Sequence, residues 1–271
     1  MSLKELTLYG EVDKVEIAIQ RLKLHEPKEG YYVAFSGGKD SCVALDLVRR
    51  AGVKYDVHYS VTTVDPPELV QFIKEKYSEA WEGREKPKKS MWQLIEDRGM
   101  PPTRLVRYCC QILKENGGEG RVVITGVRHA ESFKRSKRKM VETCKKKKGK
   151  SFLHPIIDWA ENEVWEYIKK YNVPYCGLYD KGFKRLGCLL CPYGGGQRQL
   201  EEAQLYPKYK ENYIRAFDRM VKRNAEKGKA NKYGWKTGED VFRWWVGQDN
   251  RLKEDDSQIT LFGLRLDETD V

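Results

Sequence analysis

The sequence predicts an α/β fold, a doubly wound and mostly parallel sheet with a helical C-terminal extension. Three observations lead to this prediction. Short segments rich in Val, Ile, Tyr and Phe alternate with segments of helical periodicity over residues 11–171. A glycine-rich turn joins the first of these strands to the helix that follows it. Beyond Pro192 the pattern is only helical, polar and aromatic, which predicts a boundary between residues 1–192 and 193–271.

Each element follows from a local pattern. The lead-in helix is expected because Val12, Val15, Ile19 and Leu22 recur at helical spacing. Pro66 and Pro67 begin the helix expected over residues 66–77, at positions where the missing N–H of proline is tolerated. In chain order we expect helix 11–24, strand 31–36, helix 40–51 ended by Gly52, strand 55–61, helix 66–77, helices 91–97 and 103–115, strand 121–126, extended segment 152–159, and helices 161–171, 197–223 and 238–248.

Composition limits the class of protein and its partners. The 271 residues carry 51 basic and 40 acidic side chains, a net charge of +11, which favours a polyanionic partner. The basic segment 134–150 is expected either to contact nucleic-acid phosphates or to be a solvated loop. The sequence has no apolar run that could span a bilayer and no signal-like N-terminus, so we expect a cytoplasmic protein without a membrane partner.

The stretch SGGKDS, residues 36–41, has the composition of a phosphate-binding turn. Gly37 and Gly38 allow the backbone to turn tightly and to approach a ligand closely. The helix that begins here presents its first N–H groups to an anion. Ser36 and Ser41 add hydroxyl donors and Lys39 adds a positive charge, although the Walker A spacing is absent.

Four of the seven cysteines are paired along the chain. Cys109 and Cys110 are adjacent, and Cys188 and Cys191 form a CxxC motif. Such thiolates bind zinc, copper or iron–sulfur clusters, and neighbouring cysteines on one helix suit a cluster better than a single small ion. The alternatives are a redox CxxC or buried structural thiols. The other three cysteines, which lack this spacing, are Cys42, Cys144 and Cys176.

These motifs resemble those of the phosphoadenosine phosphosulfate (PAPS) reductase family, within the superfamily of PP-loop ATP pyrophosphatases or adenine nucleotide α-hydrolases. The resemblance covers residues 30–192 and includes SGGKDS, TGVRHAES (125–132) and the segment 154–192. It implies an adenine-nucleotide site on Ser36, Gly37, Gly38, Lys39, Asp40, Ser41, Gly126 and Arg128. Among these it implies catalytic roles for Lys39, Asp40 and Arg128, with Asp40 as a Mg²⁺ contact in members that use ATP.

The cysteine set resembles that of the adenosine phosphosulfate (APS) reductases, which hold a 4Fe–4S cluster. The resemblance therefore implies such a cluster on Cys109, Cys110, Cys188 and Cys191. The ATP-pyrophosphatase subunits of DNA phosphorothioation systems are similar in fold and cluster.

Three functions follow from the resemblance. Reductases of this family use a catalytic cysteine near the C-terminus, but the last cysteine in this sequence is Cys191. We therefore expect an enzyme that cleaves ATP to AMP and pyrophosphate and activates an acceptor, such as a nucleic acid, for sulfur chemistry. A cysteine desulfurase would then be the sulfur donor. The alternatives are a thiol-dependent APS or PAPS reductase served by thioredoxin, and a noncatalytic nucleotide-binding partner protein.

Overall fold

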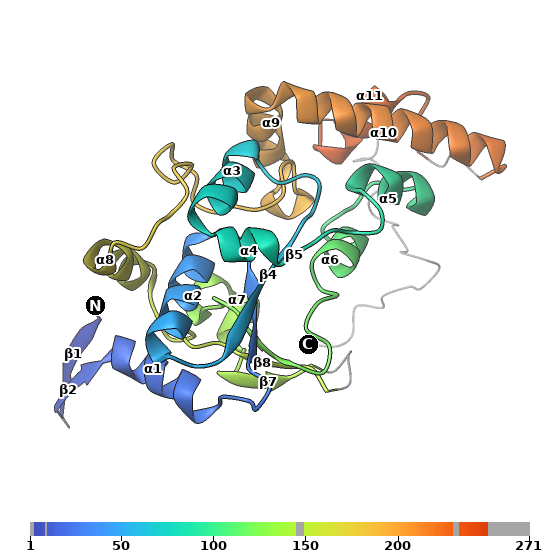
Figure 1. The fold of residues 1–271 in the computed structure, drawn as a ribbon. Helices are drawn as coiled ribbons and strands as arrows, with labels where there is room; N and C mark the ends of the chain where they lie inside the picture. The colour runs from blue at the N-terminus through green and yellow to red at the C-terminus, as the bar shows by residue number, and fades with distance from the viewer. Residues whose placement is uncertain (1–2, 9, 145–148, 230–232, 249–271) are drawn as a thin grey trace, which may run out of the picture. The chain divides into compact units, whose positions relative to one another are not determined.

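The computed structural model describes residues 3–8, 10–144, 149–229 and 233–248 (Figure 1). The chain divides into two compact units, each built from two stretches of sequence. Unit 1 comprises residues 1–91 and 108–189, and unit 2 comprises residues 92–107 and 190–271.

Unit 1 is built around a six-stranded sheet in the order β5-β4-β3-β6-β8-β7. All neighbouring strands are parallel except the β7–β8 pair at one edge. The strands are β3 (Tyr31–Phe35), β4 (Tyr55–Ser60), β5 (Arg84–Glu85), β6 (Val122–Ile124), β7 (Val141–Thr143) and β8 (Ser151–Leu153). This sheet confirms the predicted α/β class. The edge strands β5 and β7 were not predicted, because their sequences RE and VET lack the apolar run that marks β6.

Helices alternate with these strands and bury apolar faces in a common core with them. The helices of unit 1 are α1 (Lys14–Leu24), α2 (Lys39–Ala51), α3 (Pro67–Lys76), α4 (Ser78–Glu82), α6 (Tyr108–Leu113), α7 (Phe133–Ser136) and α8 (Glu161–Tyr171), with the 3₁₀ turn η1 (His129–Glu131). Buried side chains of α1, α2, α3, α4 and α8 join those of β3, β4, β6 and β8 in one cluster. The core thus holds the carboxyl ends of β3, β4 and β6 in fixed register beside the first turn of α2.

The lead-in helix begins later than predicted. Asp13 caps α1 by accepting a hydrogen bond from the Val15 amide at 2.8 Å. Gly10–Asp13 instead forms β2, which pairs antiparallel with β1 (Lys4–Thr7). The predicted start at residue 11 was therefore wrong by three residues, because an Asp cap outweighs the apolar spacing that includes Val12.

Two further helix predictions need correction. The predicted helix 103–115 is shortened to α6, because the chain near Pro101 and Pro102 turns, with the Thr103 amide bonded to the Val106 carbonyl at 3.2 Å. The predicted helix 197–223 is two helices, α9 (Gly196–Leu205) and α10 (Pro207–Glu226). Pro207 has no N–H to continue the first helix and instead begins the second.

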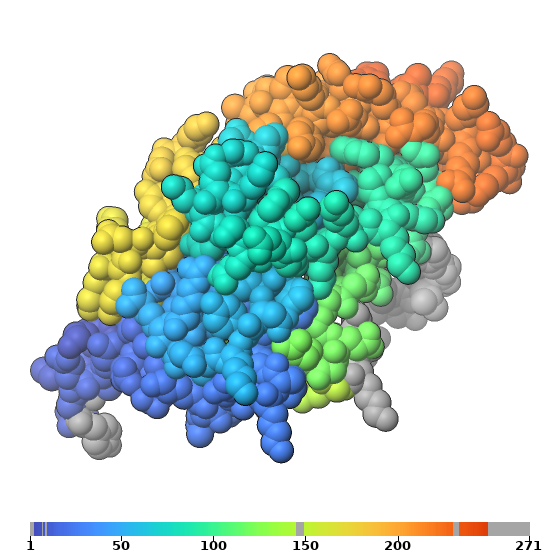
Figure 2. Space-filling model, viewed as in Figure 1, coloured from blue at the N-terminus to red at the C-terminus, as the bar shows by residue number. Residues whose placement is uncertain are grey.

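Unit 2 combines helical residues from two distant parts of the sequence. Residues 92–98 of α5 (Met91–Arg98) belong to it, together with α9, α10, the 3₁₀ turn η2 (Pro192–Gly194) and α11 (Gly238–Trp245). Tyr213 lies at its centre, with its ring 4.9 Å from that of Trp92 and 4.8 Å from that of Trp245. In Figure 2 the green surface of α5 borders the orange surface of α10. This unit confirms the predicted helical C-terminal part.

In the described part of the chain, no helix is long and apolar enough to cross a membrane.

Candidate nucleotide-binding site

The SGGKDS turn lies between β3 and α2, as predicted. Gly37 has a φ of +71°, and a Cβ there would approach the Leu69 Cδ1 to 2.7 Å. Both the left-handed backbone and the crowding require glycine at this position. Gly38 is extended and is the N-cap residue of α2. The turn therefore places the first turn of α2 at the carboxyl end of the sheet.

Hydroxyl groups fix the shape of the turn. Ser41 Oγ donates to the Gly38 carbonyl at 2.7 Å and lies 3.2 Å from Ser36 Oγ. The Lys39 amide donates to the Tyr179 hydroxyl at 2.9 Å. Burial raises the pKa of Tyr179, so its phenol stays protonated.

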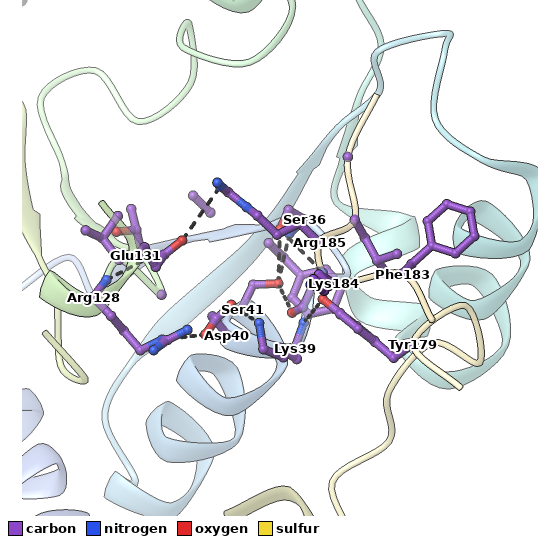
Figure 3. Close-up of a pocket in the computed structure, with 18 of the residues that line it drawn as sticks. Ser36, Lys39, Asp40, Ser41, Arg128, Glu131, Tyr179, Phe183, Lys184 and Arg185 are labelled. Atoms are coloured by element: carbon purple, nitrogen blue, oxygen red, sulfur yellow. Dashed lines mark hydrogen bonds and ion pairs between the residues drawn. The ribbon is translucent and has the colours of Figure 1, made fainter. Parts of the chain in front are cut away.

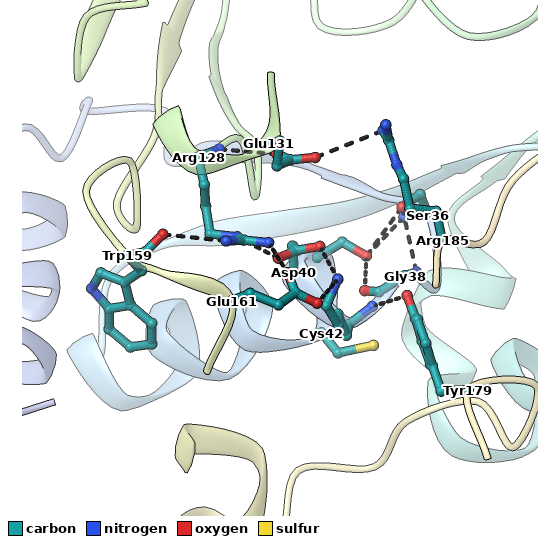
Figure 4. A network of polar contacts seen from close by, with 12 residues as sticks. Ser36, Gly38, Asp40, Cys42, Arg128, Glu131, Trp159, Glu161, Tyr179 and Arg185 are labelled. Atoms are coloured by element: carbon teal, nitrogen blue, oxygen red, sulfur yellow. Dashed lines mark hydrogen bonds and ion pairs between the residues drawn. The ribbon is translucent and has the colours of Figure 1, made fainter. Parts of the chain in front are cut away.

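Two nearly inaccessible cations lie at the turn, and Figure 4 shows the polar contacts of Arg128 with Asp40 and Glu161. Lys39 is 3% exposed and Arg128 is 1% exposed. Arg128 Nε donates to an Asp40 carboxylate oxygen at 2.6 Å, and its Nη2 donates to Glu161 at 2.6 Å. The Lys39 Nζ lies 3.1 Å from Asp40 and 3.2 Å from Glu161. The predicted residues Lys39, Asp40 and Arg128 are thus brought together.

The backbone and carboxylates around Arg128 hold its guanidinium in one position. Its Nη1 donates to the Trp159 carbonyl at 3.2 Å, and its amide donates to Glu131 at 3.0 Å. Burial lowers the pKa of Arg128, but Asp40 and Glu161 outweigh this effect and raise it overall. Since two carboxylates compensate the charge, burial of this arginine is tolerated.

Gly126 lets the end of β6 approach the start of α2. A Cβ on Gly126 would lie 2.5 Å from the Asp40 carbonyl oxygen. Only glycine permits this contact without a shift of one backbone against the other. The predicted residue Gly126 therefore has a clear structural role, which is to bring Arg128 close to Asp40.

A cavity of about 930 Å³ opens beside these groups, entirely within unit 1 (Figure 3). Of the described residues that line it, six are basic and four are acidic, an excess of positive charge that favours an anion. The basic residues are Lys39, Lys114, Arg128, Arg135, Lys184 and Arg185, and the acidic ones are Asp40, Asp65, Glu131 and Glu161.

The structure separates the four paired cysteines between the two units. Cys109, Cys110 and Cys188 belong to unit 1 and Cys191 to unit 2. Across the described ranges, no three Cys, His, Asp or Glu side chains are gathered so that they could hold a metal ion. The predicted cluster on Cys109, Cys110, Cys188 and Cys191 therefore stays a prediction.

Two of these thiols nevertheless share a cationic neighbour. Negative charge at Cys188 raises the pKa of Lys114 more than burial lowers it, and Asp65 and Cys110 raise it further. Cys110 and Cys188 therefore lie near one ammonium group that also lines the cavity.

The basic segment 134–150 is partly engaged within the protein. Arg135 pairs with Glu131, and Arg138 with Glu142 at 2.5 Å. Lys150 is buried and donates to the Gly117 carbonyl. Residues 145–148 lie outside the described residues. The predicted contact with nucleic acid stays a prediction.

Sequence reasoning missed Glu161, Tyr179 and the basic pair Lys184–Arg185 as members of the site. Arg128 could have signalled a carboxylate partner, because a buried arginine requires one. Nothing in the sequence indicates which of 40 acidic residues supplies it. The fold decides this by placing the start of α8 beside α2.

The glycine turn, the buried cations and the cavity at the ends of parallel strands define a nucleotide-binding α/β fold. Residues 30–193 match the model of the phosphoadenosine phosphosulfate reductase domain. This chain belongs to that family, and so to the PP-loop, adenine nucleotide α-hydrolase-like superfamily.

Similar proteins include two groups of relatives. An uncharacterized protein of Methanocaldococcus jannaschii is 32% identical over 69% of this chain and 47% of its own length. A second uncharacterized protein from that organism is 30% identical over 80% of this chain and 46% of its own length. The chain thus spans about half the length of these two relatives. An adenosine 5'-phosphosulfate reductase of Oceanobacillus iheyensis is 30% identical over 58% of this chain and 69% of its own length.

Among solved structures, the chain is similar to a phosphoadenylyl-sulfate (PAPS) reductase from Candida auris in a phosphate complex. The TM-score is 0.48 and the identity 20%, over 65% of this chain and 88% of that one.

Proposed function

We propose that the cavity binds an adenine nucleotide by its phosphates and cleaves ATP to AMP and pyrophosphate. One observation supports this most directly. Lys39 and Arg128 are almost fully buried, yet both line the cavity beside the start of α2. Buried cations that face a cavity stabilise a bound anion strongly, since little water competes for them.

The proposed reaction is displacement at the α-phosphorus. An acceptor oxygen or nitrogen attacks this phosphorus, the bond to the bridging oxygen of the β-phosphate breaks, and pyrophosphate leaves with the electron pair. The proton of the acceptor passes to solvent, and the product is an adenylylated acceptor. AMP leaves in a second step, when a sulfur nucleophile from the donor attacks the activated acceptor atom and the bond from that atom to the adenylyl group breaks, its electron pair leaving with AMP. Lys39 and the amides of α2 would hold the leaving pyrophosphate, and Arg128 would neutralise charge at the reacting phosphate.

Mg²⁺ would accompany ATP in this reaction. Asp40 was the expected contact, but its two oxygens already face Arg128 and Lys39. We therefore assign Asp40 the role of orienting these cations, with the metal held mainly by the nucleotide phosphates.

Reduction of APS or PAPS is the second candidate, because several relatives bear the name of adenosine 5'-phosphosulfate reductase. That reaction needs a thiolate at the sulfonate. No described residue that lines the cavity is a cysteine. Cys42, in α2, is fully buried, and burial raises its pKa to about 12. A reductase would thus need a thiol delivered from beyond these residues, and thioredoxin to regenerate it.

The test compares products. Anaerobic protein is incubated with ATP and Mg²⁺, and separately with APS or PAPS plus thioredoxin, while pyrophosphate and sulfite are measured. Pyrophosphate from ATP, abolished in Lys39→Ala, supports the proposal. Sulfite from APS or PAPS without pyrophosphate from ATP refutes it in favour of the reductase. Binding without either product would indicate the noncatalytic alternative.

The cysteines support a separable proposal, a 4Fe–4S cluster on Cys109, Cys110, Cys188 and Cys191. Its support is the spacing of the two pairs and the shared neighbour of Cys110 and Cys188, the ammonium group of Lys114.

A nucleic-acid acceptor for the proposed reaction is supported by the net charge of +11 of the chain. A sulfur-donor protein such as cysteine desulfurase would then supply the sulfur.

A further inference from the structure

Four adjacent strands present one row of residues to the cavity side of the sheet. Ala34 of β3 pairs with His58 of β4. The β3–β6 register aligns Val33 with Ile124, so one step further Thr125 lies beside Ala34. The β6–β8 register aligns Ile124 with Leu153, so His154 lies beside Thr125. Neighbours in a parallel register point to the same face.

Three members of this row, His58, Ala34 and Thr125, line the cavity. The row crosses β3 at Ala34, two residues before Ser36, and two residues correspond to about 6–7 Å along a strand. The row is therefore a wall of the cavity below the phosphate turn. Ala34 is small and carries no polar side-chain group, and it lies between the hydroxyl of Thr125 and the imidazole of His58.

His154 lies behind this wall and is 0% exposed. Its Nδ1 is 2.7 Å from Thr125 Oγ1, and its Nε2 is 3.2 Å from Arg138 Nη2. A guanidinium only donates hydrogen bonds, so Nε2 must accept. The single proton of the neutral ring is then on Nδ1, and Nδ1 must donate to Thr125.

The surroundings of His154 favour this neutral form. Burial, and after it the nearby charge of Arg138, lowers the pKa of His154 to about 4, although Glu142 acts in the opposite direction. Arg138 is itself held in place by Glu142 at 2.5 Å and by the contact of its backbone carbonyl with His129 Nε2 at 2.8 Å. The ring is thus fixed in one tautomer.

We propose that Thr125 is a specificity residue whose hydroxyl donates to an acceptor atom in the nucleoside part of the ligand, with Arg138 and His154 as the positioning residues that fix this direction. Because Thr125 Oγ1 accepts from His154, its own proton is directed away from that ring and is available to a ligand in the cavity that Thr125 lines. The inference rests on the proposed function, since it needs a nucleotide in this cavity.

Binding of two ligands to matched variants tests the contact. ATP carries a nucleoside and tripolyphosphate does not. Thr125→Val should weaken ATP binding about three- to tenfold and leave tripolyphosphate binding unchanged, whereas Thr125→Ser should retain ATP affinity. Lys39→Ala should weaken binding of both ligands. If Thr125→Val binds ATP as wild type does, while Lys39→Ala does not, the inference fails and the proposed function stands. If neither ligand binds the wild type, both fail.

Two further measurements distinguish the proposed hydrogen bond from Thr125 to the ligand from a purely structural role of Thr125, Arg138 and His154. Arg138→Met should weaken ATP binding in the wild-type background and have no further effect in Thr125→Val. Nitrogen-15 NMR should find the His154 proton on Nδ1 in the wild type and on Nε2 in Arg138→Met, with His154→Asn identifying the signal. A wild-type ring protonated on Nε2, or additive effects of Arg138→Met and Thr125→Val, would overturn the inference.

Discussion

In the site without a ligand, Glu161 is the exposed acidic residue that pairs with both buried cations. Its carboxylate bridges Arg128 and Lys39, yet its own side chain is 56% exposed. Asp40 contacts the same two cations, but it is only 20% exposed and part of α2. A phosphate that enters the cavity therefore competes with Glu161 for these cations more easily than with Asp40.

This competition predicts a gain of affinity in Glu161→Gln. The amide keeps the size of the side chain but removes the charge that occupies Arg128 and Lys39. Pyrophosphate and ATP should bind about three- to tenfold more tightly, measured by calorimetry, with the gain reduced by the partial exposure of the carboxylate. Glu29→Gln, exposed and outside the cavity, is the control. Weaker binding in Glu161→Gln would show instead that Glu161 mainly orients the cations.

Lys39→Ala should have the opposite effect. Loss of one charge-assisted contact to phosphate costs on the order of 1.5–3 kcal/mol, or about ten- to a hundredfold in affinity. Calorimetric titration with ATP measures it, and Lys28→Ala, an exposed lysine outside the cavity, should bind as wild type does. Equal affinities in both variants would remove the turn from the site.

The individual site residues were predictable only where they share a motif. SGGKDS, Gly126 and Arg128 follow from short sequence patterns. Glu161 and Tyr179 do not, because Arg128 and Glu161 are 33 positions apart and Lys39 and Tyr179 are 140 positions apart. These pairs form only because the fold places α8 and the loop that follows it beside the start of α2.

At the level of the elements, the alternation of strands and helices was predictable because buried strands and amphipathic helices have distinct periods. Element ends were not. The start of α1 depends on the Asp13 cap, and α9 and α10 are separated by Pro207. Strand β5 has only two residues and is defined by its pairing with Tyr59 and Ser60, which only the folded sheet supplies.

The approach of β6 to α2 predicts the effect of Gly126→Ala. The added methyl group would meet the Asp40 backbone at 2.5 Å, so one of the two elements must move. The free energy of unfolding should fall by about 1–3 kcal/mol, and ATP binding should weaken because Arg128 shifts from Asp40. Urea unfolding and calorimetry measure the two effects. Gly177→Ala, where the nearest atom is 3.9 Å away, should change neither. Unchanged unfolding in Gly126→Ala would contradict this reading of the contact.

The cysteine pairs give a second prediction at this scale. If α6 and the segment after Gly187 hold a 4Fe–4S cluster, anaerobically purified protein should be brown and contain about four irons per chain. Cys188→Ser should lose most of this iron, whereas Cys144→Ser should retain it. Stoichiometric zinc without iron would contradict the cluster.

At the scale of the whole molecule, one buried ring should make stability depend on pH. His154 is neutral in the fold, with a pKa of about 4 against an ordinary value of 6.5. Between these values the unfolded chain binds a proton that the folded chain does not, so the free energy of unfolding falls as the pH falls. The loss is about 1.4 kcal/mol per pH unit, or about 3 kcal/mol from pH 6.5 to 4.

Urea unfolding of wild type and His154→Asn at several pH values measures this loss. The difference between the two proteins should shrink by about 3 kcal/mol from pH 6.5 to 4, because only the wild type must keep the ring uncharged. A constant difference over this range would show that His154 does not titrate on unfolding.

The division of unit 2 into residues 92–107 and 190–271 has a consequence for synthesis on the ribosome. Trp92 and Glu96 leave the exit tunnel long before their partners Tyr213 and Arg219, and 123 positions separate Glu96 from Arg219. At roughly 5–20 residues per second, this segment waits on the order of 6–25 seconds. The nascent chain thus presents this aromatic segment before its partners exist, and chaperones that bind such segments have time to act on it.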